Sequence, residues 1–144
     1  MIYVPHVDHT TVATGAIFVL LSLSLQYGPL FGQSWLAAMK RDKNGDHWMQ
    51  KDPKASLPGL FLKEFLLSLC KAWTTGLLLN LTQAGTILQA AQLGAFLFFG
   101  TVAPAITSEY LWEKRGMDLL RFKYLSGFVS TVLLSVLMNS LGTA

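Results

Sequence analysis

Four residues of the segment 62–81 have side chains that could do chemistry within an otherwise apolar stretch. They recur every three or four positions and so share one narrow face of an α-helix, which turns by about 100° per residue: Glu64, Ser68, Lys71 and Thr75. Ionisable groups inside a membrane commonly bind ions, relay protons or line a substrate path. We take this polar stripe as the candidate functional site.

Lys71 separates two interpretations of the polar stripe. It follows Glu64 by seven residues, which is about 10 Å along a helix. In the first interpretation the lysine stem carries its ammonium towards the headgroups, with Glu64 as its partner. In the second the ammonium faces a wet interior, because an unpaired charge in lipid costs several kcal/mol. The second interpretation predicts a polar path along the helix.

Other residue patterns give no catalytic, cofactor or metal site. His6, Asp8 and His9 have side chains that can bind metals, but such residues at an exposed terminus are usually solvated. The single cysteine, Cys70, cannot form an internal disulfide. There is no phosphate loop and no Cys/His metal spacing, so we expect no cofactor. A membrane enzyme that uses Glu64 as acid or base is the least supported function.

The composition indicates a membrane protein. Of 144 residues 52% are hydrophobic and 13% are charged, about half of the roughly 25% usual in soluble domains. Residues 10–39 and residues 72–108 contain no Asp, Glu, Lys or Arg. Both stretches exceed the roughly 20 residues that span a hydrocarbon core. A soluble helical domain needs charges on its wet faces, so that class is excluded.

We predict an all-α integral membrane protein with four transmembrane helices in an up-down bundle. The spans are expected, within one domain covering 1–144, at about 11–27, 62–81, 87–108 and 124–141. Nine of the 11 basic residues lie in the loops 40–56 and 109–123. By the positive-inside rule these loops are cytoplasmic, and both termini lie on the non-cytoplasmic side. The net charge of +3 is thereby a topology signal, and we expect no nucleic-acid partner.

The inner end of the first span has residues that could anchor and end a helix. Tyr27 is expected at headgroup level, and Gly28-Pro29 should end the helix because proline lacks an amide donor. The following piece, 31–40, can then lie along the membrane surface. A turn with an anchor is one interpretation of this loop, and a binding role is the other.

This stretch resembles a known family. A tyrosine, a proline, then Phe-Gly and a tryptophan at the inner end of the first span are similar to the bacterial and fungal membrane proteins named domain of unknown function 1761. The matching residues are Tyr27, Pro29, Phe31, Gly32 and Trp35. The chain departs from the family at Gln26, where Trp is frequent, and at Gly127-Phe128, where many members have Tyr-His. The resemblance implies the four-span architecture and leaves the activity open.

Small or polar residues recur every four positions in the last two spans. In the segment 124–141 they form the ladder Gly127, Thr131, Ser135 and Asn139, and in 87–108 the ladder Gly100, Pro104 and Ser108. This spacing puts small residues on one face, where helix backbones can approach closely. Pro104 should also kink its helix at Gly100. The expected partners are the lipid bilayer and, through these ladders, a second copy of the chain.

The sequence leaves two main functions for a multi-pass membrane protein of unknown activity. The first is a structural or accessory helix bundle, for which the ladders are sufficient. The alternative is a transporter or channel subunit with a polar path along the segment 62–81. Four short helices leave little room for a cavity in a monomer, so this alternative would need an oligomer.

Overall fold

The chain is helical throughout the part that the structure, a computed structural model, describes: residues 2–44 and 57–142 have no strand. The charged residues Lys51 and Lys54 of the first predicted loop lie outside these ranges. The α-helices are α1 (His9–Leu25), α2 (Gly32–Lys43), α3 (Leu57–Leu81), α4 (Ile87–Leu97), α5 (Ala103–Trp112), α6 (Met117–Phe128) and α7 (Leu134–Leu141). Three π-helical turns lie between them: η1 (Gln26–Leu30), η3 (Phe98–Val102) and η4 (Val129–Leu133).

The π-helical turns join α-helices into longer rods. Turn η1 extends α1, η3 joins α4 to α5, and η4 joins α6 to α7. Where a kink was expected before Pro104, the α-helix widens into the π turn η3, which accommodates the amide that proline lacks. Three rods are long and apolar enough to cross a membrane: His9–Leu30, Ile87–Trp112 and Met117–Leu141. Helix α3, with 25 residues, is not among them and carries Lys63, Glu64 and Lys71.

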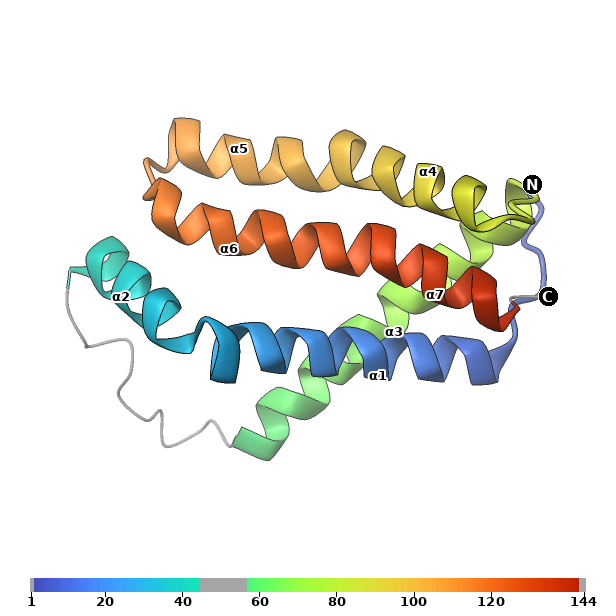
Figure 1. Cartoon of the computed structure of the whole chain (residues 1–144), viewed down its shortest axis with the longest axis horizontal. Coiled ribbons are helices and arrows are strands. Elements are labelled where there is room, and N and C mark those ends of the chain that lie inside the picture. Colours follow the sequence, from blue (N-terminus) through green and yellow to red (C-terminus); the bar gives the residue numbers. More distant parts are fainter. Residues whose placement is uncertain (1, 45–56, 143–144) are drawn as a thin grey trace.

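The three rods and α3 run alternately in opposite directions (Figure 1). Both termini and the α3–α4 turn lie at one end of the molecule, which we name the terminal end. Helix α2 and the α5–α6 turn lie at the other, the α2 end. Helix α3 crosses the bundle obliquely and packs chiefly against α1 and α7. It therefore diverges from α5 and α6 towards the α2 end.

The connection predicted at 109–123 is much shorter in the structure. Only residues 113–116 lie between the helices, because α5 and α6 extend into it from both sides. The charges expected in a loop instead pair across the helical hairpin. Lys123 Nζ lies 2.5 Å from Glu109 Oε2, and Arg115 Nε lies 3.9 Å from the same oxygen. Paired charges allow both helices to continue past the predicted span ends.

The sequence predicted that the first rod ends at Tyr27, but in the structure it continues through η1 to Leu30. The chain passes Pro29 inside η1, where the Phe31 N–H donates to Gln26 O at 3.1 Å, five residues back. This wider spacing accommodates the missing proline amide without ending the helix. The backbone then turns sharply into α2. A Cβ on Gly32 would lie 3.1 Å from the Tyr27 carbonyl oxygen, so the turn favours glycine there.

Glycines set the closest contacts between the last two rods. A Cβ on Gly94 of α4 would lie 2.5 Å from Val132 Cα in η4. A Cβ on Gly127 of α6 would lie 2.4 Å from Val102 Cγ1 in η3. Backbones can therefore approach here only because side chains are absent.

The two small-residue ladders have different environments. In the ladder of the last rod Gly127, Thr131 and Ser135 are buried and Asn139 is half-buried, so this ladder faces the chain's own helices. In the other ladder Gly100, Pro104 and Ser108 are all exposed. A Cβ on Gly100 would have nothing within 4 Å.

The terminal end is held by hydrogen bonds between side chains and backbone. Asp8 caps α1 by accepting from the Thr11 N–H at 3.0 Å and the Thr11 hydroxyl at 2.7 Å. These bonds hold the pKa of the Asp8 carboxyl below its usual value. The Thr11 hydroxyl also lies 2.6 Å from Gly142 O, and Asn80 Nδ2 donates to His6 O at 2.7 Å. The N-terminal segment is thus tied to α7 and to α3.

Gly94→Ala should destabilise the bundle, whereas Gly100→Ala should not. A methyl group at position 94 meets backbone atoms of η4, and overpacking of this kind costs about 1–3 kcal/mol. At position 100 the methyl group has open space and removes the entropic cost of a helical glycine. Thermal unfolding of both variants in one mild detergent makes the comparison. Equal midpoints would contradict the close approach of α4 and η4.

Candidate functional site: a polar cavity along α3

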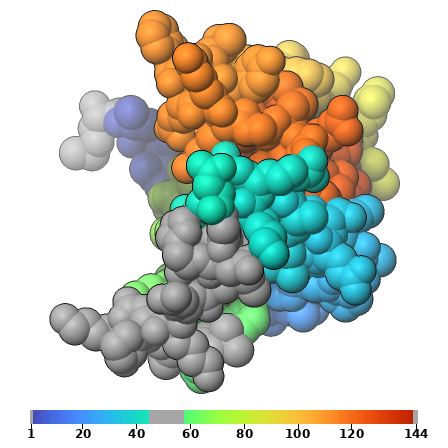
Figure 2. All heavy atoms as spheres, turned by 90° about the vertical axis from the view of Figure 1, so that its left-hand side faces the viewer, coloured from blue at the N-terminus to red at the C-terminus, as the bar shows by residue number. Residues whose placement is uncertain are grey.

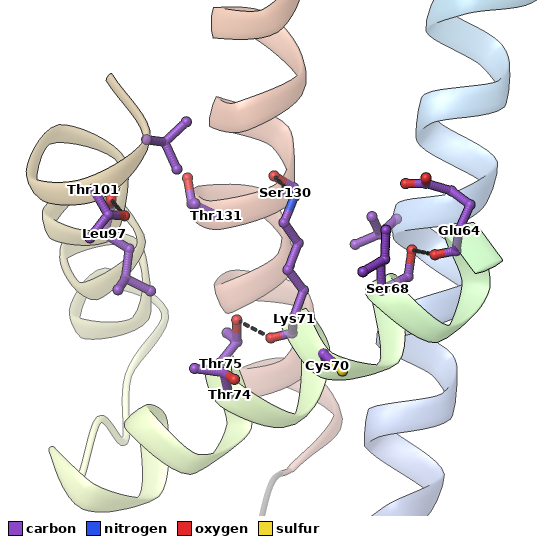
Figure 3. A pocket seen from close by; sticks show the side chains of 13 residues that line it. Glu64, Ser68, Cys70, Lys71, Thr74, Thr75, Leu97, Thr101, Ser130 and Thr131 are labelled. Atoms are coloured by element: carbon purple, nitrogen blue, oxygen red, sulfur yellow. Dashed lines mark hydrogen bonds between the residues drawn. The ribbon is translucent and has the colours of Figure 1, made fainter. Parts of the chain in front are cut away.

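All four residues of the polar stripe lie on the wall of one cavity of about 490 Å³. Ser68 and Thr75 are buried, Glu64 is half-buried, and Lys71 is exposed within the cavity. The opposite wall consists of η3 and η4 (Figure 3), which contribute the hydroxyl groups of Thr101, Ser130 and Thr131. Val19 of α1 and Leu97 of α4 complete the lining, so helical segments of one chain bound the cavity, which the sequence did not predict for a monomer.

Lys71 reaches across the cavity to the last rod. Its Nζ donates to Ser130 Oγ at 3.3 Å, and its side chain points away from the terminal end (Figure 3). Within residues 2–44 and 57–142, no carboxylate oxygen lies within 4.0 Å of Lys71 Nζ, that of Glu64 included. The structure thus places Lys71 and Glu64 on one wall without the ion pair of the first interpretation.

The Lys71–Ser130 contact lies deep in the bundle. Lys71 is about 15 Å from the end of α3 at Leu81, and Ser130 is about 17 Å from the end of α7 at Leu141. A lysine at the centre of a membrane-spanning helix costs about 2.5–3.5 kcal/mol on insertion scales. Within a membrane, a single hydroxyl partner would offset little of that cost.

Several hydroxyl groups around the cavity have already used their protons. Four of them donate to the carbonyl four residues earlier in the same rod, with O···O distances of 2.5–2.9 Å: Ser68, Thr75, Thr101 and Thr131. A hydroxyl has one proton and two lone pairs, so these oxygens offer acceptors to the cavity. Among the described residues of the cavity wall, Lys71 is the cationic donor.

A second cavity, of about 650 Å³, lies nearer the N-terminal end of α3, where Leu60, Phe61 and Glu64 line it. Tyr27 and Gly28 of η1 line it, together with Trp35 of α2. Glu64 lines both cavities. Each of the three π turns therefore borders one of the cavities, as expected of turns that are frequent at functional sites.

The family-like motif connects the α2 end of the first rod to α6. The Tyr27 hydroxyl lies 2.7 Å from Ser126 Oγ, which also donates to Gln26 Oε1 at 3.0 Å. The Tyr27 ring packs edge-on against Trp35, with centroids 5.1 Å apart. The motif thus forms a polar and aromatic contact between helices.

Helix α2 packs against α6. Arg41 forms an ion pair with Asp118, and Phe31 packs against Phe122 at 6.1 Å between ring centroids. Seen from the α2 end, α2 lies between the end of the first rod and the α5–α6 hairpin (Figure 2). The piece predicted to lie on the membrane surface is therefore held by contacts with the protein.

The sequence analysis missed two serines that form hydrogen bonds between helices. Ser126 forms a hydrogen bond with Tyr27 of the motif, and Ser130 accepts a hydrogen bond from Lys71. Isolated serines in an apolar helix are usually packing residues, and these two lie one position before Gly127 and Thr131 of the ladder. Their own four-residue spacing was the available signal for a second polar face.

Ser126→Ala should destabilise the protein by about 1–3 kcal/mol, because Gln26 is buried and loses a hydrogen-bond partner. Ser140→Ala is the matched control, since Ser140 is exposed and its hydroxyl donates only to Val136 O of its own helix. That control should stay within about 0.5 kcal/mol of the wild type. Thermal unfolding measures both, and equal losses would mean that the Gln26–Ser126–Tyr27 contact does not stabilise the fold.

Comparison with known proteins gives one family and one curated relative. Residues 10–139 match the family described as Protein of unknown function (DUF1761). The UPF0591 membrane protein C15E1.02c of Schizosaccharomyces pombe is 26% identical over 140 residues, which cover 97% of this chain and 94% of that protein. No solved structure matches. Together with the three apolar rods, the match indicates an integral membrane protein.

Proposed function

The chain belongs to the family Protein of unknown function (DUF1761), as its motif predicted, and on this premise we propose that it crosses the membrane four times. Helix α3 is the additional span beside the three apolar rods. Its 25 residues measure about 37 Å, enough for a hydrocarbon core of about 30 Å. Its polar face lines the cavities, and its exposed side chains include Leu62, Leu66 and Trp73.

The α2 end is the cytoplasmic end in this proposal. All described basic residues outside α3 belong to α2 or to the α5–α6 hairpin: Lys40, Arg41, Lys43, Lys114, Arg115, Arg121 and Lys123. The terminal end has none. The positive-inside rule then puts both termini on the non-cytoplasmic side.

Single cysteines at Thr10 and at Asn44, in a Cys70→Ser background, should be labelled from opposite sides of the membrane by an impermeant thiol reagent. One proposed span, the first rod, separates the two positions, so they should lie on opposite sides of the membrane. Sealed vesicles of both orientations provide the measurement, with detergent-opened vesicles as the control for reactivity. Labelling of both positions from one side would contradict the proposed topology.

We propose that the cavity along α3 binds a ligand within the membrane, which corresponds to the transport or channel alternative. One observation carries this proposal: the Lys71 ammonium lies at mid-depth in a cavity of about 490 Å³, with Ser130 as its hydrogen-bond partner. The volume is within the roughly 300–1,000 Å³ of ligand pockets. A bundle with only a structural role would gain stability from an apolar residue at this position.

A structural or accessory role is the second candidate, and the exposed small-residue ladder of the α4–α5 rod favours it. Gly100, Pro104 and Ser108 are exposed together on one rod, with space for another helix against Gly100. A second copy of the chain is the proposed partner for this face. In this role the cavity would be dry and the protein would act through association.

Cys70 offers a direct test, because this native thiol lines the cavity beside Lys71. Methanethiosulfonates react with the thiolate, which requires water. In lipid nanodiscs Cys70 should react at least about tenfold faster than a cysteine at Phe96 in a Cys70→Ser background. Phe96 is 76% exposed on the lipid-facing side at a similar depth. Equally slow reaction at both positions would indicate a dry cavity and favour the accessory role.

A further inference from the structure

The Lys71 ammonium has donors that its neighbours leave unused. It carries three N–H groups, and Ser130 Oγ accepts one of them at 3.3 Å. The four cavity hydroxyls that donate to helix carbonyls form no hydrogen bond with Nζ, and no described carboxylate lies within 4.0 Å of it. The chemical complement of this group is an acceptor that carries negative charge.

The charges on the cavity wall favour an anion with one charge. Glu64 lines the same cavity as Lys71, so the described wall has one cation and one acid. A dianion such as a phosphate monoester would face a carboxylate with only one ammonium to balance it. A carboxylate adds only one like charge near Glu64, and it accepts hydrogen bonds from two N–H groups of Lys71.

The remaining wall is apolar and open to the side. Leu67, Leu97 and Val102 line the cavity, and wall residues such as Cys70 and Thr101 are exposed. Helix α3 packs on α1 and α7 and crosses away from the α4–α5 rod (Figure 1). In a membrane this opening faces lipid tails, so the ligand needs an apolar part.

We propose that a long-chain carboxylate, the anion of a fatty acid, binds in this cavity. Its carboxylate accepts from Lys71 Nζ, and its chain lies against Leu67, Leu97 and Val102. This inference rests on the proposed function, because it names the ligand class of the same cavity.

The experiment measures binding of radiolabelled oleate to the full-length protein in nanodiscs of phosphatidylcholine, with empty nanodiscs as background. Lys71→Met should weaken binding by at least about tenfold. Glu64→Gln should strengthen binding roughly two- to fivefold, because it removes a like charge. Lys63→Met is the matched control on the same helix and should leave the affinity unchanged, since Lys63 does not line the cavity.

The chemistry of the competitor separates head group from chain. Unlabelled oleate should displace the label, whereas oleyl alcohol and acetate should displace it at least about tenfold less well. Oleyl phosphate should also be weaker, because of its second charge. Displacement by the alcohol at the same concentration as oleate, or an unchanged affinity in Lys71→Met, would overturn the inference.

Thermal unfolding of each variant separates lost binding from lost folding. If Lys71→Met does not fold, Glu64→Gln still tests the inference. Stronger oleate binding in that variant supports it, and weaker binding contradicts it. Saturable oleate binding that is absent from empty nanodiscs supports the inference. A Cys70 that reacts quickly in a protein that binds no oleate overturns the long-chain carboxylate but leaves the proposed cavity function standing. A Cys70 that reacts as slowly as the position 96 control, with no oleate bound, overturns both.

Discussion

A lysine near the middle of α3 is the constraint on which the arrangement of the bundle depends. In the proposed four-span topology, lipid would not solvate an ammonium at this depth, which accounts for the polar face of α3 turning towards other helices. That face meets Ser130 of η4 across a cavity, while other sides of α3 carry exposed Leu and Trp side chains. The oblique path of α3 follows from both demands, since it packs on α1 and α7 yet leaves room around Lys71.

The space around Lys71 is compensated by tight packing between the other helices. Gly94 and Gly127 bring α4 and α6 so close to the opposite rod that a single methyl group would collide at either position. In lipid such contacts replace the hydrophobic driving force that holds soluble bundles together. At the α2 end the Tyr27–Ser126 bond and the Arg41–Asp118 ion pair add polar contacts. The last two rods are therefore tightly packed against each other, whereas a cavity lies along α3.

Patterns within single segments were sufficient to predict the all-α class, the family and the face of the polar stripe. Glu64, Ser68, Lys71 and Thr75 do share one wall, because their spacing alone fixes a helix face. The partner of Lys71 could not be predicted, since it depends on how two helices cross. The π turns were also missed: Pro29 signals a break, but whether a helix ends or widens there depends on what the freed backbone and neighbouring side chains contact.

Glu64 relates the two cavities to each other and to the charge of any ligand. It lines the cavity bounded by η1 as well as the one that holds Lys71, so its carboxylate stands between them. An anion that came through the η1 cavity would have to pass this like charge before it met Lys71. An anion that enters sideways, past the exposed residues between α3 and η3, meets Lys71 without passing Glu64. For the proposed ligand, the placement of this one acid thus favours entry from the lipid.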